Sequence, residues 1–182
     1  NNELNFLISY LFLLLLIGNF VFFISLIHLD YLFLRYFFTI SFILIFLFNI
    51  KKIISIKLKF FSNIKFFFIK NKIFTLIILS YFLLTLLPIL DADSLDYHLG
   101  FGIDVINNKK LILREDWLHH RLAGLGEYLN LFGMIMGVKN LGIFLQFSSL
   151  FIILVSLMSV ANKKLSQDKD VNKIFLFLFS SP

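Results

Sequence analysis

The sequence predicts an all-α, multi-pass membrane protein whose transmembrane helices frame a large external loop of amphipathic surface helices. Hydrophobic residues make up 59% of the 182 residues, whereas they approach about half of a soluble domain. The mean hydropathy is +0.91. Apolar runs near the ~20 residues that cross a bilayer recur along the chain, and lysines gather between these runs. Together these observations exclude an ordinary soluble domain.

Five apolar segments are expected to cross the membrane. They cover residues 4–27, 31–50, 73–90, 141–161 and 174–182, the last being cut short. The first segment is longer than the apolar part of a secretory signal and lacks a small-residue cleavage site, so a retained span is expected. Because the chain opens on Asn1 and closes inside a hydrophobic run, we expect it to be a fragment of a longer protein.

The distribution of charge predicts the topology. The linker 51–72 carries seven lysines and no acid, and the stretch 162–173 carries four lysines, so both are expected on the cytoplasmic side. Residues 91–116 hold six acids against three bases and are expected on the periplasmic or extracellular side. The expected location is therefore a cell membrane, such as a bacterial inner membrane. Lysines interleaved with apolar residues suit an amphipathic linker on the anionic inner leaflet, and we expect no nucleic-acid partner.

Residues 118–138 are apolar but do not fit a further span. The segment contains two histidines, an arginine and a glutamate, and a crossing here would place the lysines of 162–173 outside. We therefore predict a surface-lying or re-entrant helical hairpin, which extends the external loop over residues 91–140. Gly133 and Gly137 match a small-xxx-small pattern, for which tight helix packing is the favoured interpretation.

An acidic stretch follows directly after the predicted span 73–90. It contains three carboxylates, a phenol and an imidazole within eight residues: Asp91, Asp93, Asp96, Tyr97 and His98. A helix capped by Asp91 or Asp93 is expected to run toward Asn107 and to lie flat in the membrane interface. Its predicted apolar stripe consists of Leu95, Leu99, Gly102 and Ile106, and its predicted wet face of Asp93, Asp96, Gly100 and Asp104.

The carboxylates of this stretch have two interpretations. Asp91 and Asp93 could simply cap a helix, which contributes about 1 kcal/mol and needs no chemistry. Three acids within six residues exceed what capping needs, however, and close like charges raise at least one pKa. Such a cluster suits a general base or a cation site. We favour Asp93 as the base.

The order of these elements resembles the integral-membrane glycosyltransferases of the C-type fold (GT-C), such as the lipid A aminoarabinose transferases and the protein O-mannosyltransferases. The resemblance covers about residues 88–162. Asp93 to Tyr97 match an Asp-Glu-x-x-Tyr-like signature at the start of the first external loop, with Ser94 in place of the usual second acid. Asn107 to Lys110 resemble the turn after the flat helix, and residues 117–138 the second surface segment.

The resemblance implies transfer of a sugar from a polyprenyl-phosphate donor to an acceptor at the external face. The acceptor could be a glycolipid, a glycan or a protein. Asp93 would be the catalytic base, and Arg121, with His119 or His120, would stabilise the departing phosphate. The candidate substrate-binding residues are Asp91, Asp96, Tyr97, His98, His119, His120, Arg121 and Glu127.

Each candidate has a structural alternative. Arg121 could extend to the lipid headgroups, and Glu127 could be a paired structural charge as readily as a cavity residue. Adjacent His119 and His120 lack the spacing of a zinc site, and the chain has no cysteine, so no metal site is assigned. No cofactor is assigned either, although a divalent cation held by the acids is left open.

Two other classes of function are retained. A transporter, flippase or polysaccharide-polymerase component would use the acidic loop to bind an ion or a substrate, but a proton or ion relay needs ionisable residues near the bilayer midplane. A passive membrane scaffold would need no clustered acids at the exit of a span. The sequence favours the glycosyltransferase.

Overall fold

All regular structure in the described part of the chain is helical. The computed structural model describes residues 2–27, 30–48, 72–88, 98–112 and 123–164. The helices are α1 (Asn2–Ile27), the helix Tyr31–Phe48, α3 (Lys72–Leu86), α4 (Gly100–Asn108), α6 (Leu125–Ile135) and α7 (Leu141–Lys164). The predicted all-α class is confirmed for these residues. Most of the basic linker and the predicted last span, 174–182, lie outside them.

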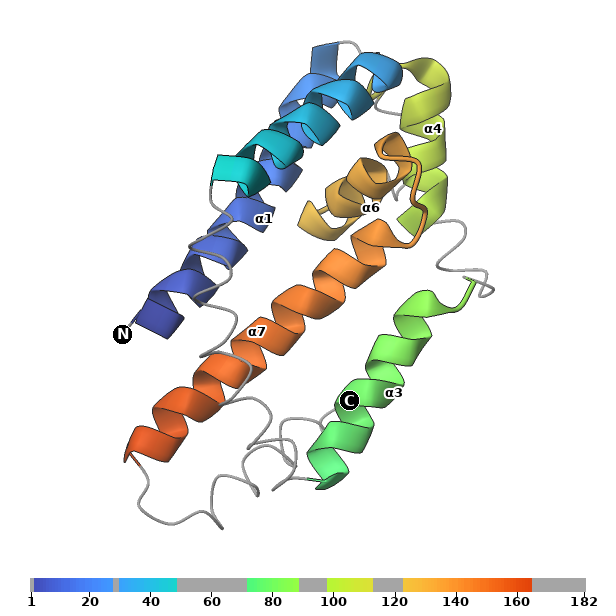
Figure 1. Ribbon diagram of the computed structural model, residues 1–182. Coiled ribbons are helices and arrows are strands. Elements are labelled where there is room, and N and C mark those ends of the chain that lie inside the picture. The colour runs from blue at the N-terminus through green and yellow to red at the C-terminus, as the bar shows by residue number, and fades with distance from the viewer. Residues whose placement is uncertain (1, 28–29, 49–71, 89–97, 113–122, 165–182) are drawn as a thin grey trace.

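The long helices lie side by side, and the two short ones gather at one end (Figure 1). α7 contacts both α1 and α3, and α6 contacts α1, α4 and α7. α1 and α3 run toward the end where α4 lies, whereas α7 starts there and runs away from it. The first residue of α3, Lys72, and the last of α7, Lys164, therefore lie at the end opposite to α4.

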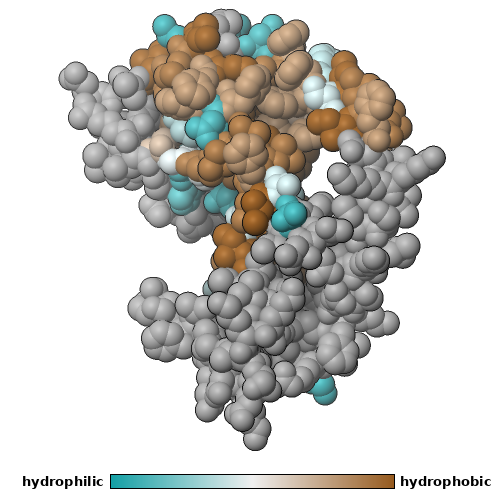
Figure 2. All heavy atoms as spheres, turned by 90° about the vertical axis from the view of Figure 1, so that its left-hand side faces the viewer, coloured by the Kyte–Doolittle hydropathy of each residue, from teal (hydrophilic) through white to brown (hydrophobic). Residues whose placement is uncertain are grey.

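Two of the described helices are long and apolar enough to cross a membrane. They are the segments Ile8–Ile27 and Tyr31–Phe48. Many of their large apolar side chains are exposed, and Figure 2 shows brown, hydrophobic atoms over much of the described surface in that view. Such extensive apolar exposure is unusual for a soluble monomer and suits contact with lipid or another apolar surface.

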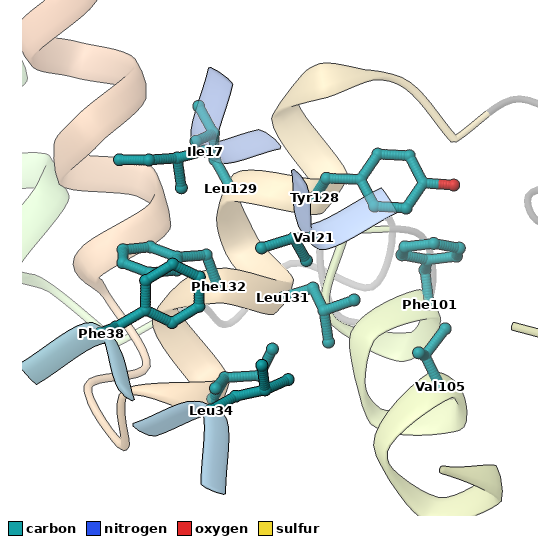
Figure 3. Packing of buried hydrophobic residues seen from close by; sticks show 11 residues of the cluster. Ile17, Val21, Leu34, Phe38, Phe101, Val105, Tyr128, Leu129, Leu131 and Phe132 are labelled. Carbon is teal, nitrogen blue, oxygen red and sulfur yellow. The ribbon is translucent and has the colours of Figure 1, made fainter. Parts of the chain in front are cut away.

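The core forms around α6. Ile17 and Val21 from α1, and Phe38 from the helix Tyr31–Phe48, pack on one side of α6, and α4 packs on the other (Figure 3). The ring of Phe132 meets Phe38 edge to face, with the centroids 5.0 Å apart. All residues of α6 from 127 to 133 are buried within the protein. Whether this segment lies on a membrane surface or re-enters the membrane stays a prediction.

α4 exists where a helix was expected, but it buries a different face. Leu99 and Gly102 of the predicted stripe are buried within the protein, and Phe101 and Val105, which lie outside that stripe, are buried completely. Whether the stripe rests on a membrane stays a prediction. Ile103, which follows Leu99 by one turn, is 51% exposed. The face is rotated because α4 packs on α6, where the ring of Phe101 meets Tyr128 edge to face at 5.3 Å.

Gly133 and Gly137, which match the small-xxx-small pattern, have different roles in the structure. A Cβ atom on Gly133 would lie 2.8 Å from the backbone nitrogen of Gly142, so Gly133 permits close packing of α6 against α7, as expected. Gly137 lies in the turn after α6 with a φ of +77°, a conformation that favours glycine. Its role is therefore in the turn rather than on a helix face.

Candidate functional site

The predicted site residues divide into those that the structure describes and those outside its described ranges. Outside lie Asp91, Asp93, Asp96, Tyr97, His119, His120 and Arg121. The two that it describes, His98 and Glu127, are in direct contact. The structure thus joins the end of the acidic stretch to the second predicted surface segment.

The contact between His98 and Glu127 is short and partly shielded from water. Nδ1 of His98 lies 2.8 Å from Oε1 of Glu127. The side chain of His98 is 40% exposed, whereas that of Glu127 is 9% exposed. His98 lies in a wide helical turn that leads into α4, and Glu127 is the third residue of α6. The imidazole can therefore be reached from solvent while the carboxylate that orients it is buried.

A second interaction holds the other oxygen of the Glu127 carboxylate. Its Oε2 accepts a hydrogen bond of 2.7 Å from the backbone N–H of Gly124. The first N–H groups of a helix have no partner within the helix, and an acid at the third position can reach back to satisfy one of them. The negative charge also lies at the favourable end of the helix dipole. Of the two interpretations considered for Glu127, the paired structural charge matches this arrangement, with His98 as its partner.

Tyr128 adjoins this pair on α6. Figure 3 shows its ring beside Phe101, with the hydroxyl directed away from the cluster. Burial raises the pKa of the Tyr128 phenol, and the neighbouring Glu127 carboxylate raises it further. The phenol is thus held in its neutral form, in which it can donate a hydrogen bond.

Polar side chains continue along the interface between α6 and α7. Nε2 of Gln146 donates to the carbonyl oxygen of Gly126 at 3.1 Å and to Oδ1 of Asn130 at 3.0 Å. Asn130 is 3% exposed, so this partner matters, because a buried amide without one is costly. The two hydrogen bonds connect α7 to the turn of α6 that carries Glu127.

Sequence reasoning missed two further polar contacts. Nε of Arg35 donates to the carbonyl oxygen of Ile135 at 2.8 Å, which places a cation at the C-terminal end of α6. Nδ2 of Asn140 donates to the carbonyl oxygens of Thr85 and Leu87, both at 3.2 Å. The partners are 53 or more residues apart, and no periodicity reveals such pairs. A polar residue within an apolar run was the available signal for Arg35.

Among the residues that the structure describes, no group of three or more His, Cys, Asp and Glu side chains could hold a metal ion. The expected cation site consists of Asp91, Asp93 and Asp96, which lie outside those residues. A divalent cation therefore stays a prediction of the sequence.

Fold and site define a helical protein with two helices able to cross a membrane and a histidine–carboxylate pair beside the acidic stretch. The chain belongs to the family described as the DUF1420 N-terminal domain, whose model matches residues 41–182. No curated protein and no solved structure matches it.

Proposed function

We propose that this chain is part of a multi-pass membrane glycosyltransferase that uses a lipid-linked donor. The sugar would move from a polyprenyl phosphate to an acceptor hydroxyl of a glycolipid, a glycan or a protein. Transfer would take place at the external, periplasmic or extracellular face of the cell membrane. Asp93 is the proposed general base.

The observation that carries this proposal is the contact between His98 and Glu127. Asp93 precedes His98 by five residues. The contact attaches the C-terminal end of the acidic stretch to α6, the most buried helix of the described core. Catalysis by a general base needs a carboxylate held in a defined position, because the reacting atoms must be aligned. A stretch that served only to cap a helix would not need this long-range attachment.

The arrangement of charges supports the proposed topology. Lys72 begins α3 and Lys164 ends α7, and both lie at the end of the helices opposite to α4. Cytoplasmic ends of membrane helices are enriched in lysine and arginine. On this basis, the end with α4, the helix that follows the acidic stretch in the sequence, faces the outside, where the phosphodiester of a lipid-linked donor would lie.

In the proposed reaction, the Asp93 carboxylate takes the proton of the acceptor hydroxyl. The acceptor oxygen attacks the anomeric carbon as the bond between that carbon and the phosphate oxygen breaks, which inverts the configuration. Negative charge develops on the leaving polyprenyl phosphate. Arg121 is the proposed bidentate partner for that charge, with His119 or His120 beside it. Glu127 would hold the acidic stretch through its contact with His98, and the more exposed His98 would line the substrate site.

A transporter or flippase is less well supported by the described helices. Their four long members carry Asp, Glu, Lys or Arg only within five residues of an end. The innermost of these residues, Arg35, donates to the end of α6. A proton or ion relay would instead use ionisable residues near the bilayer midplane. The described helices therefore favour chemistry at the membrane surface.

The test is transfer of a labelled sugar from polyprenyl-phosphate donors in membranes that contain the full-length protein. Asp93→Asn is expected to lower the rate by about 10²- to 10⁴-fold, the usual contribution of a general base. Asp30→Asn is the matched control, because Asp30 is an exposed carboxylate that caps the helix Tyr31–Phe48, and it should retain activity. Unchanged transfer by Asp93→Asn would refute the assignment of the base. If the wild type transfers from no donor in a broad panel, the transporter and scaffold classes gain support.

A further inference from the structure

Asn140 connects the turn before α7 to the end of α3. Its Nδ2 lies 3.2 Å from the carbonyl oxygens of both Thr85 and Leu87. α3 ends at Leu86, so Leu87 lies just outside the helix. The last carbonyls of a helix have no partner within it, and the proline at position 88 has no N–H to offer. The amide of Asn140 supplies donors that the local sequence lacks.

This contact fixes the chain just before the acidic stretch, and the His98–Glu127 contact fixes it just after. Leu87 precedes Asp91 by four residues, and His98 follows Asp96 by two. Glu127 belongs to α6, and Asn140 immediately precedes α7. Both attachments therefore come from one helix pair.

The α6–α7 pair is packed closely enough to act as a single support. A Cβ atom on Gly142 would lie 2.4 Å from the Cα atom of Asn130, so the two backbones are in direct contact. The amide of Gln146 on α7 also donates a hydrogen bond to Oδ1 of Asn130. Packing at this distance leaves no room for sliding without a clash. The two attachment points thus keep a fixed separation.

We propose that Asn140 is a positioning residue which, together with Glu127, holds both flanks of the acidic stretch on the α6–α7 pair. The inference rests on the proposed function, because it assigns to Asn140 the placement of Asp93. A support that holds both flanks restricts where the carboxylate between them can lie. The catalytic carboxylate then spends more time in the reactive position.

The first test measures the attachment itself, without reference to activity. A nitroxide is placed on Leu87→Cys, a position that is 54% exposed, in the full-length protein with any other cysteine replaced. Asn140→Asp keeps the shape of the side chain but replaces the donating N–H groups with an oxygen. The lines in the electron paramagnetic resonance spectrum of the nitroxide should then narrow, because the label moves faster. Asn108→Asp is the matched control, because the amide of Asn108 donates within its own helix to Asp104, and it should leave the spectrum unchanged.

The second test measures transfer by the same variants at equal amounts of folded protein. Asn140→Asp is expected to lower kcat about tenfold and to change KM less than about twofold, because displacement of a catalytic group slows the reaction more than it weakens binding. Asn140→Gln, which retains the amide, should recover part of kcat. A purely structural role would lower the amount of folded protein and leave kcat unchanged.

The outcomes separate the two proposals. An unchanged Leu87 spectrum in Asn140→Asp would overturn the attachment, whatever the activity. A narrowed spectrum with an unchanged kcat would overturn the positioning role. A wild type that transfers from no donor would overturn the proposed function, while the spectra would still decide whether Asn140 holds the end of α3.

Discussion

Replacing Gly142 with alanine is expected to force α6 and α7 apart. The new methyl group would lie 2.4 Å from both the Cα atom and Oδ1 of Asn130, and 2.7 Å from its backbone nitrogen. Real Cβ atoms do not approach so closely, and backbone atoms cannot move aside as the end of a flexible side chain can. The hydrogen bond between Gln146 and Asn130 would be strained by the same displacement.

The expected loss of stability follows from three terms. Overpacking a close contact costs about 1 to 3 kcal/mol, and the disturbed hydrogen bond adds about 1 kcal/mol. The higher helix propensity of alanine offsets up to about 1 kcal/mol of this loss. The free energy of unfolding should therefore fall by about 2 kcal/mol, which for a chain of this size lowers Tm by about 4 to 8 °C.

The measurement is a thermal melt in detergent, followed by circular dichroism, with Gly102→Ala as the control. A Cβ atom at Gly102 would also meet an atom closely, at 2.6 Å, but that atom is the sulfur of the flexible Met134 side chain. Gly102→Ala should therefore shift Tm little in either direction. The reasoning would be refuted if Gly142→Ala melted at or above the wild-type temperature, or if Gly102→Ala were the less stable variant.

Two further predictions concern pH and capping. The Tyr128 pKa is raised in the folded protein, so the neutral phenol stabilises the fold below the unfolded pKa of 10.0, and this stabilisation is lost as pH rises through the folded pKa. In thermal melts between pH 9 and 11, Tyr128→Phe should therefore lose less stability than the wild type. Tyr36→Phe, which changes an exposed ring, should lose as much stability as the wild type. Asp30 caps the helix Tyr31–Phe48 by accepting hydrogen bonds of 3.1 Å from two backbone N–H groups. Asp30→Ala should lower Tm by about 2 to 4 °C, and Asp30→Asn should lower it much less. Equal Tm values for the two variants would contradict the capping role.

The positions of the helices could be predicted because they depend on local composition. Apolar runs predicted segments at 4–27 and 31–50, and helices occupy Asn2–Ile27 and Tyr31–Phe48. Whether each helix crosses a membrane stays a prediction. The orientation of α4 was not predictable in the same way, because Phe101 is buried by Tyr128 from a distant segment. Periodicity shows which face of a helix is apolar, but not which neighbour will cover it.

The site was predicted in part for the same reason. His98 and Glu127 were both candidates, yet nothing in a separation of 29 residues indicated that they would meet. Asn140 was missed because an asparagine at the start of a helix is usually only a cap. Its actual partners are carbonyl groups at the end of another helix. Such contacts follow from how helices pack, which sequence patterns do not specify.

The polar residues of α6 explain how an apolar chain of this kind can fix one arrangement of its helices. Apolar side chains pack about equally well in several registers, so they alone would allow α6 to shift along α7. Buried Asn130 and Glu127 are each costly without a partner, by about 1 to 3 kcal/mol, and Gln146, Gly124 and His98 are in place to satisfy them in the observed register. A shift of α6 by one turn would separate Asn130 from Gln146 and Glu127 from His98, whereas the bond from Gly124 to Glu127 lies within the same segment and would move with it. The register that satisfies Asn130 is therefore also the register that brings Glu127 to His98, and so the packing of α6 determines where the acidic stretch is held.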